Sequence, residues 1–330
     1  MDGWTTEVKA GVEGRLVAFF ETERARVTAI APEADALHGA IEALTMRGGK
    51  RLRPAVLYAA FRGVRPDGGL GDVVDACAGL ELLQSYLLIH DDWMDGDDER
   101  RGGPSVHAAL RDAGFERHLA DSLAILAGNL ACTWSWRLFG TEPRVHEVVL
   151  RMHEEVLVGQ QLDLMAVEDV SRMHRLKTGS YTLRGPMALG AVIGGATDEQ
   201  LAAIDSFAAP LGEAFQLRDD LLGTFGDPRD TGKPGNDLRA GKRTALVLAA
   251  QRSGAPLREL DAVLGVADAP DAAVDAARDL LVRVGAKRSV EQRLGALLGE
   301  ARIALAQAPL SQPGVAMLGE LVDRLAYREA

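Results

Sequence analysis

The spacing of apolar residues restricts the fold of this chain more than any other feature, because these residues recur every three or four positions in stretch after stretch. This is the period of a helix with one buried face, whereas the alternation typical of a half-buried strand is nearly absent. Ala, Leu, Glu and Arg dominate the same stretches, and all four favour helices. The pattern predicts an all-α protein of about ten helices joined mostly by short loops.

Breaks that contain Gly and Pro separate the helical stretches, for example "RGGKRLRP", "GVRPDGGLG" and "FGDPRDTGKPGNDLRAGKR". A length of 330 residues would by itself suggest about two domains. None of the breaks is both long and low in complexity, so no linker divides the chain. We therefore expect one domain over residues 1–330, folded as a single large helical bundle.

Charge and cysteine content limit the partners and the compartment. A net charge of −11 argues against a nucleic-acid partner. No run reaches the roughly 18 uninterrupted apolar residues of a membrane span, and the N-terminus lacks the pattern of a signal peptide. Cys77 and Cys132 lie in apolar stretches, which favours reduced thiols in a cytoplasmic protein. An anionic ligand would need local positive charge from metal ions or from clustered Lys and Arg.

The densest negative charge lies in "HDDWMDGDDERRGG", residues 90–103. Asp91 and Asp95 are four apart and share a helix face, near a C-terminal end whose dipole disfavours anions. One interpretation is a solvated acidic helix end. The other is that bound cations offset the repulsion, and carboxylate oxygens suit Mg²⁺. A second helix end, with Asp219 and Asp220, favours the metal site.

Basic residues form four clusters at Gly, Thr or Pro breaks rather than along helix faces. Each cluster alone is typical of a solvated surface. Together with the acids they supply what two diphosphates and Mg²⁺ would require, because Arg suits bidentate phosphate binding and Lys acts as a point charge. No "GxxxxGK[ST]" follows a strand, so nucleotide phosphotransfer has no support. The basic residues are Lys50, Arg51, Arg53, Arg100, Arg101, Lys177, Lys233, Lys242 and Arg243.

Six motifs in this order resemble the trans-isoprenyl (polyprenyl) diphosphate synthases of the short-chain type, which include farnesyl and geranylgeranyl diphosphate synthases. They are "GGKRLRP", "DDWMDGDDERRGG", "GQQLD", "KTGS", "FQLRDDLLGTFGD" and "TGKPGNDLRAGK", and they cover nearly the whole chain. The resemblance implies an all-α bundle around a central apolar cavity, usually as a homodimer. It also implies head-to-tail condensation of isopentenyl diphosphate with dimethylallyl, geranyl or farnesyl diphosphate.

The same resemblance implies a role for individual residues. The Mg²⁺ ligands, for three ions with substrate bound, would be Asp91, Asp92, Asp95, Asp219 and Asp220. The allylic diphosphate would be held by Arg100, Lys177, Lys233 and Lys242. Isopentenyl diphosphate would be held by Lys50, Arg53, Gln84 and Arg101. Thr178 and Gln216 would face the reacting carbons, and with Asp91, Asp95, Asp219 and Lys177 they form the expected catalytic set.

The second acidic motif departs from the family pattern. Gly223 stands where many members have a third Asp, and Asp227 is the next acid along the chain. Whether Asp227 reaches a metal ion is left open by the sequence.

Product length depends in this family on bulky residues one turn before the first aspartates. Tyr86 and Leu87 lie five and four residues before Asp91. One aromatic residue there, with a "DDxxD" that lacks an insertion, favours the C20 product geranylgeranyl diphosphate, with C15 farnesyl diphosphate as the alternative.

Three other functions share some of these features. A non-catalytic subunit of a heteromeric synthase would usually lack the acids of one motif, and both are present. A terpene cyclase would not need Lys50 and Arg53 for a second diphosphate. A bundle that stores metal ions would need the acids but not the basic clusters.

Overall fold

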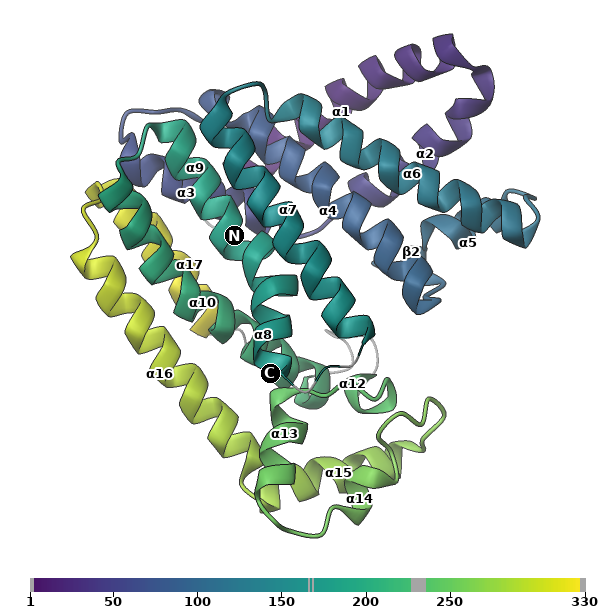
Figure 1. Ribbon diagram of the computed structural model, residues 1–330, viewed down its shortest axis with the longest axis vertical. Helices are drawn as coiled ribbons and strands as arrows, with labels where there is room; N and C mark the ends of the chain where they lie inside the picture. Colours follow the sequence, from purple (N-terminus) through teal and green to yellow (C-terminus); the bar gives the residue numbers. More distant parts are fainter. Residues whose placement is uncertain (1–2, 166, 168, 227–235, 327–330) are drawn as a thin grey trace. The chain divides into compact units, whose positions relative to one another are not determined.

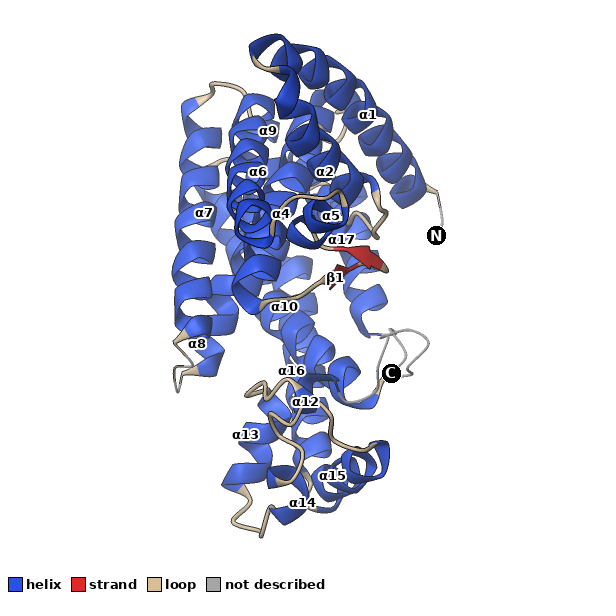
Figure 2. Ribbon diagram, turned by 90° about the vertical axis from the view of Figure 1, so that its right-hand side faces the viewer, coloured by secondary structure: helices blue, strands red, loops and turns tan. Residues whose placement is uncertain are grey.

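The computed structural model describes residues 3–165, 167, 169–226 and 236–326 of the 330-residue chain. These residues are almost entirely helical (Figures 1 and 2), which confirms the predicted all-α fold. The elements are α1 Trp4–Ile30, η1 Pro32–Ala34, α2 Asp35–Met46, α3 Leu52–Val64, η2 Leu70–Asp72, α4 Val74–Asp95, β1 Glu99–Arg100, β2 Gly103–Pro104, α5 Val106–Asp112, α6 Arg117–Leu138, α7 Pro143–Leu164, α8 Val170–His174, η3 Arg175–Arg184, α9 Gly185–Gly194, α10 Asp198–Phe225, α12 Asn236–Arg239, α13 Ala245–Arg252, α14 Arg258–Asp261, α15 Asp271–Arg283, α16 Ala286–Gln307 and α17 Gln312–Ala326.

The chain forms two compact units. One contains Met1–Val148 and Leu189–Gly195, and the other contains Val149–Ala188 and Ala196–Ala330. The boundaries fall inside α7, inside α9 and just after the end of α9 rather than in a long loop. The expectation of one domain over residues 1–330 stays a prediction.

Helix α4 is the centre of the first unit. Every residue from Ala76 to Leu83 is buried, so about two turns of the helix have no solvent-facing side. Helices α1, α2, α3 and α6 pack around it. A helix that is buried all round has no polar stripe, and the charged residue in this run, Glu81, forms an ion pair with Arg51.

Helix α4 ends at Asp95 because Gly96 adopts a left-handed backbone, with φ of 72°. Its N–H donates to the carbonyl of Asp92, which closes the last turn. Glycine adopts this conformation without the steric cost that a Cβ would bring. The first acidic motif therefore lies at the C-terminal end of a buried helix.

Helix α10 is the centre of the second unit, where α8, η3, α12, α13, α16 and α17 pack around it. It begins with a capping box between Thr197 and Gln200, and its apolar residues, such as Phe207 and Leu211, are buried. Asp219 and Asp220 lie near its C-terminal end. Each unit thus carries one acidic motif at the end of its central helix.

Both cysteines are free thiols, with Cys77 buried and Cys132 half-buried. Burial raises the pKa of the Cys77 thiol well above its usual range. Among the described residues, no helix combines the length and the apolar composition needed to cross a membrane.

Candidate active site

A two-residue hairpin explains the sequence "RRGG" after the first acidic motif. Strands β1 and β2 pair antiparallel, with Arg100 opposite Gly103, and the turn consists of Arg101 and Gly102 (red strands in Figure 2). Their φ values of 54° and 71° are both positive, as the tight hairpin turns require. Gly103 is needed for another reason: a Cβ there would lie 2.8 Å from Cζ of Arg47.

The guanidinium of Arg47 fixes this hairpin. It donates hydrogen bonds to the carbonyl of Arg100 at 2.9 Å and to that of Pro104 at 2.8 Å. The hairpin in turn directs Arg100 toward the end of α4.

Arg100 binds the first acidic motif directly. Its Nε donates to Oδ1 of Asp92 at 2.6 Å, and its Nη2 lies 3.9 Å from Oδ2 of Asp91. Asp92 is fully buried, and its Oδ2 has no hydrogen-bond partner. Burial raises the pKa of Asp92, while Arg100 acts in the opposite direction. The end of α4 therefore contains a buried carboxylate whose charge Arg100 only partly compensates.

The basic residues of "GGKRLRP" separate into two groups. Arg51 turns inward, is 3% exposed, and forms ion pairs with Glu81 and Glu13. Lys50 is exposed and Arg53 is half-buried. Arg51 therefore stabilises the core, whereas Lys50 and Arg53 lie nearer the surface.

Arg101 joins these residues into a positively charged cluster. Its Nη1 donates to the carbonyl of Gly48 at 3.0 Å. Burial lowers the pKa of Arg101, and the charges of Arg51, Arg53 and Arg100 lower it further, against the opposing effect of Glu81. Arginine nevertheless stays protonated, so this cluster favours an anionic ligand. It contains the predicted Arg53, Arg100 and Arg101.

Tyr86 lies on α4 against α6. Its ring is 7% exposed and contacts the ring of His90 edge-on, with 4.8 Å between the centroids. His90 Nε2 donates to the carbonyl of Ile125 at 3.1 Å, and the imidazole fills the space that a Cβ on Gly128 would occupy. Burial raises the pKa of the Tyr86 phenol. Leu87 and Gln84 are half-buried on the same helix.

In the second unit, the buried carboxylate is Asp220, which is 2% exposed. Its Oδ1 accepts from Gln216 Nε2 and its Oδ2 accepts from the N–H of Ala245, both at 2.8 Å. Burial raises the pKa of Asp220, against the opposing effects of His174 and of these two hydrogen bonds. Asp220 thus joins α10 to the first turn of α13, and the preceding Asp219 is half-buried.

Lys177 and Thr178 lie on η3, a π-helix, and both are half-buried. Lys177 Nζ donates to Oδ2 of Asp163 at 2.5 Å. A Cβ on Gly159 of α7 would lie 2.3 Å from the backbone nitrogen of Lys177. The π-helix can therefore contact α7 this closely only because residue 159 is glycine. Such wide turns are frequent at functional sites.

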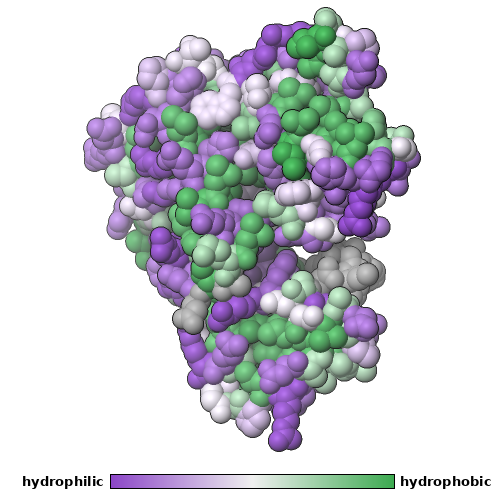
Figure 3. All heavy atoms as spheres, turned by 45° about the vertical axis from the view of Figure 1, so that its right-hand side comes forward, coloured by the Kyte–Doolittle hydropathy of each residue, from purple (hydrophilic) through white to green (hydrophobic). Residues whose placement is uncertain are grey.

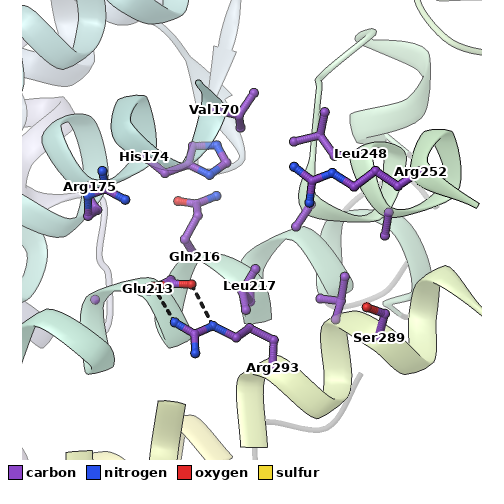
Figure 4. A pocket seen from close by; sticks show the side chains of 14 residues that line it. Val170, His174, Arg175, Glu213, Gln216, Leu217, Leu248, Arg252, Ser289 and Arg293 are labelled. Atoms are coloured by element: carbon purple, nitrogen blue, oxygen red, sulfur yellow. Dashed lines mark hydrogen bonds and ion pairs between the residues drawn. The ribbon is translucent and has the colours of Figure 1, made fainter. Parts of the chain in front are cut away.

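A pocket of about 330 Å³ lies beside this acidic end (Figure 4). His174 and Gln216 point toward one another in it, and Glu213 forms an ion pair with Arg293 on another side. Burial lowers the pKa of His174, against the opposing charges of Asp220 and Asp163. Of the predicted site residues that the structure describes, Gln216 lines this pocket and the others do not.

The described predicted residues divide between the two units, and the contacts above join some members of each group. The first contains Lys50, Arg53, Gln84, Tyr86, Leu87, Asp91, Asp92, Asp95, Arg100 and Arg101. The second contains Lys177, Thr178, Gln216, Asp219, Asp220 and Lys242. Lys233 and Asp227 lie outside the described residues.

Sequence reasoning missed three residues that contact the second group. Asp163 binds Lys177, Asp237 lies 3.0 Å from Nζ of Lys242, and His174 faces Gln216. Asp163 and Asp237 occur in two of the motifs quoted above, "GQQLD" and "TGKPGNDLRAGK". Their presence in these motifs could have marked them as site residues. Nothing in the sequence singled out His174.

The acids fit a magnesium site to which the protein contributes part of the ligands. Mg²⁺ keeps several waters and is commonly held by one or two carboxylates together with substrate phosphate. Across the residues that the structure describes, no three His, Cys, Asp or Glu side chains form a complete site. The unpartnered buried Oδ2 of Asp92 is a carboxylate oxygen of the kind that such an ion binds.

The protein is thus an all-α protein whose central helices α4 and α10 each end in acids, with basic residues beside them. The family model described as polyprenyl synthetase matches residues 34–281. The chain belongs to this family. The predicted family and the predicted prenyltransferase class are therefore confirmed.

Relatives extend over most of the chain. A geranylgeranyl diphosphate synthase of Mycobacterium tuberculosis is 34% identical, over 84% of this chain and 80% of the relative. A geranylfarnesyl diphosphate synthase of Aeropyrum pernix is 33% identical, over 89% of this chain and 95% of the relative. Since relatives of similar identity carry names with different product lengths, they leave the product length open.

A solved structure agrees with the same family. It is a geranylgeranyl pyrophosphate synthase from Corynebacterium glutamicum, complexed with isoprenyl diphosphate and magnesium. Its TM-score is 0.88 at 34% identity, and the match covers 98% of this chain and 99% of the relative.

Proposed function

We propose that this chain condenses isopentenyl diphosphate with an allylic diphosphate to give a short all-trans prenyl diphosphate, with the C20 product preferred over C15. The observation that carries the proposal is the end of α4, where Asp92 and Asp91 lie against Arg100 and the cluster around Arg101. Carboxylates that hold cations, next to arginines that hold anions, are what a metal diphosphate requires.

The proposed metal is Mg²⁺, as three ions with substrate bound. The residues that would hold it are Asp91, Asp92, Asp95, Asp219 and Asp220. Bound magnesium would neutralise diphosphate oxygens and so favour departure of diphosphate from the allylic carbon. Support comes from the carboxylate chemistry of both helix ends and from the magnesium complex of the solved relative.

The basic side chains would bind and orient the two substrates. Arg100, Lys177 and Lys242 would hold the allylic diphosphate, together with Lys233. The Arg101 cluster, with Lys50, Arg53 and Gln84, would hold isopentenyl diphosphate. Orientation matters because the double bond of one substrate must lie against the reacting carbon of the other. The proton lost at the end would go to the released diphosphate, so no side-chain base is required.

Gln216 and Thr178 would stabilise positive charge on the reacting carbons through their oxygens. The amide of Gln216 is oriented for this role, because its Nε2 donates to Asp220 and its oxygen must therefore point elsewhere. Apolar walls would keep water from the cation.

Tyr86 would end the pocket for the growing prenyl chain. Its ring is buried and is backed by His90, which in turn contacts α6. Because this packing holds the Tyr86 ring in place, a longer prenyl chain could not displace it. This favours the C20 product over longer ones.

We also propose a homodimer. Leu150, Leu157 and Leu164 lie seven residues apart on α7 and are 47%, 47% and 54% exposed. Figure 3 shows apolar patches that reach the surface among hydrophilic residues. Leucines at this spacing form one stripe along a helix, and a second copy of the chain would cover it.

The test is incubation of the purified chain with Mg²⁺, isopentenyl diphosphate and each of the C5, C10 and C15 allylic diphosphates, with product length read by mass spectrometry. A dominant C20 product is expected. Asp91→Asn should lower the rate on the order of 100-fold, whereas the exposed Asp261→Asn should leave it unchanged.

Two other outcomes would correct the proposal. Products that stop at C15 would support the condensation reaction but would show that the pocket for the prenyl chain ends nearer to the aspartates than Tyr86 does. The absence of product with every starter would contradict the enzyme and favour a non-catalytic subunit.

A further inference from the structure

Arg47 follows the last residue of α2, and its side chain reaches the β1–β2 hairpin. Its Nη1 donates to the carbonyl of Arg100 at 2.9 Å and to that of Pro104 at 2.8 Å. These carbonyls belong to opposite strands, so the two hydrogens of Nη1 hold both strands of the hairpin. A Cβ on Gly103 would lie 2.8 Å from Cζ of Arg47. The guanidinium can therefore lie against the hairpin only because residue 103 is glycine.

A second arginine joins the same two segments in the opposite direction. Arg101, in the turn of the hairpin, donates from Nη1 to the carbonyl of Gly48 at 3.0 Å. A Cβ on Gly49 would lie 3.7 Å from Cζ of Arg101, which is an ordinary contact distance. The loop that leads to Lys50 and the hairpin are thus connected by Arg47 from one side and by Arg101 from the other.

The segment from which Arg47 extends is fixed. Thr45, two residues earlier, is fully buried, and its hydroxyl shares a hydrogen bond of 2.7 Å with the hydroxyl of Ser85 on α4. The carbonyl of Thr45 accepts from Nη2 of Arg51 at 2.9 Å. Arg47 therefore holds the hairpin against a part of the chain that is anchored on the buried helix α4.

Arg100 and Arg101 depend on this contact to different degrees. Arg100 is also held by its own bond to Asp92, from Nε to Oδ1 at 2.6 Å. The bond of Arg101 instead goes to Gly48, which is next to Arg47. The backbone of Arg101 is left-handed, with φ of 54°, and a residue with a Cβ keeps this conformation only where its surroundings hold it. Loss of the Arg47 contact should therefore move Arg101 more than Arg100.

From these contacts we propose that Arg47 is a positioning residue for the binding of isopentenyl diphosphate. It acts through the hairpin, by holding Arg101 against the loop that carries Lys50. An arginine whose position is fixed in advance loses less conformational entropy when it binds an anion. The contact should therefore raise the affinity without adding a bond to the substrate. The inference rests on the proposed condensation reaction and deepens it.

The first test is isothermal titration calorimetry of the full chain with isopentenyl diphosphate and no added metal, because the residues proposed for this substrate are basic or neutral. Arg47→Met keeps an apolar stem but removes every donor, and should weaken binding on the order of 10-fold. Arg47→Lys should recover part of the affinity, since an ammonium group has hydrogens for both carbonyls. Arg65→Met, at an exposed arginine of the same unit, is the matched control and should leave the affinity unchanged.

Gly103→Ala tests the same contact from the side of the hairpin. It keeps all the cations, but the added Cβ must displace the guanidinium of Arg47, so the affinity should fall in the same direction as in Arg47→Met. Gly71→Ala is its control, because an added Cβ there meets nothing within 4 Å.

Steady-state kinetics separate positioning from general damage to the protein. In Arg47→Met the KM for isopentenyl diphosphate should rise on the order of 10-fold. The KM for the allylic diphosphate and kcat should stay within twofold of wild type, because Arg100 keeps its bond to Asp92. A smaller folded fraction would instead lower kcat and leave both KM values unchanged.

Three results would overturn the inference. The first is an affinity for isopentenyl diphosphate within twofold of wild type in Arg47→Met. The second is normal affinity in Gly103→Ala, which would show that Arg47 does not act through the hairpin. The third is an equal rise of both KM values. If the wild-type chain binds isopentenyl diphosphate but makes no product, the proposed function alone fails, and calorimetry of the variants still decides the inference.

Discussion

At the scale of single residues, three of the cations predicted to bind diphosphate are already paired with acids. Arg100 pairs with Asp92, Lys177 with Asp163, and Lys242 with Asp237. The last two pairs are partly exposed, and exposed ion pairs contribute only about 0–1 kcal/mol. These acids therefore position Lys177 and Lys242, and the ion pairs are weak enough for an anionic substrate to replace the acids.

Tyr86 is the residue on which product length should depend. Tyr86→Ala removes a buried ring from α4, so the pocket should deepen and the products should shift from C20 to C25 and longer. Mass analysis of the products measures this shift.

Tyr86→Phe is the matched control, because it keeps the ring and should keep the C20 product. An unchanged product in Tyr86→Ala would show that the ring is only part of the core.

At the scale of elements, the site depends on close packing between helix backbones. The contact of Gly159 with η3 fixes the π-helix that carries Lys177 and Thr178. Since the nearest atoms are backbone atoms, neither partner can avoid an added methyl group by rotating a side chain.

Gly159→Ala should therefore be destabilising although alanine favours helices. We expect a loss of about 2 kcal/mol in the free energy of unfolding, from overpacking, and a lower kcat/KM because Lys177 is displaced. Urea unfolding and steady-state kinetics measure the two effects.

Gly295→Ala on α16 is the control, since an added Cβ there meets nothing within 4 Å. It should stabilise the chain by about 0.5–1 kcal/mol. A Gly159→Ala variant that gains stability like Gly295→Ala would contradict the close-packing argument.

At the scale of the whole molecule, the leucine stripe on α7 is costly for a monomer in water. Burying a fully exposed leucine contributes about 1.5–3 kcal/mol, and since these three are already about half buried, a partner that covers them would add roughly half of that for each. A symmetric dimer would use the stripe twice, because the same surface serves both copies.

Leu157→Asp places a charge in the middle of this stripe and should convert a dimer to a species with the mass of one chain, 35.2 kDa. Light scattering after size-exclusion chromatography measures the mass. Ile303→Asp on α16, at a side chain that is 62% exposed, should leave the mass unchanged. A wild-type chain of monomer mass would refute the proposed dimer at once.

Much of this protein was predictable from sequence because the signals are local. Helical periodicity predicts the all-α fold, since each helix must bury one face and every turn repeats that requirement. The acids and basic residues predict a metal and diphosphate site because their chemical types and order occur in contiguous motifs, and this site stays a prediction. The division into two units could not be predicted in this way, because its boundaries lie within or beside helices and no linker in the sequence marks them.

Only the tertiary structure decided which members of each motif point where. Arg51 and Arg53 are two residues apart, yet one forms a buried ion pair with Glu81 and the other belongs to the cluster around Arg101. Asp237 lies against Gly223 through a contact between α12 and α10 that no helical spacing encodes. The sequence by itself determined the fold class, the family and the chemistry, because these follow from local periodicity and residue type. Side-chain direction and partners depend on packing between segments far apart in the chain, and therefore only the folded protein decides them.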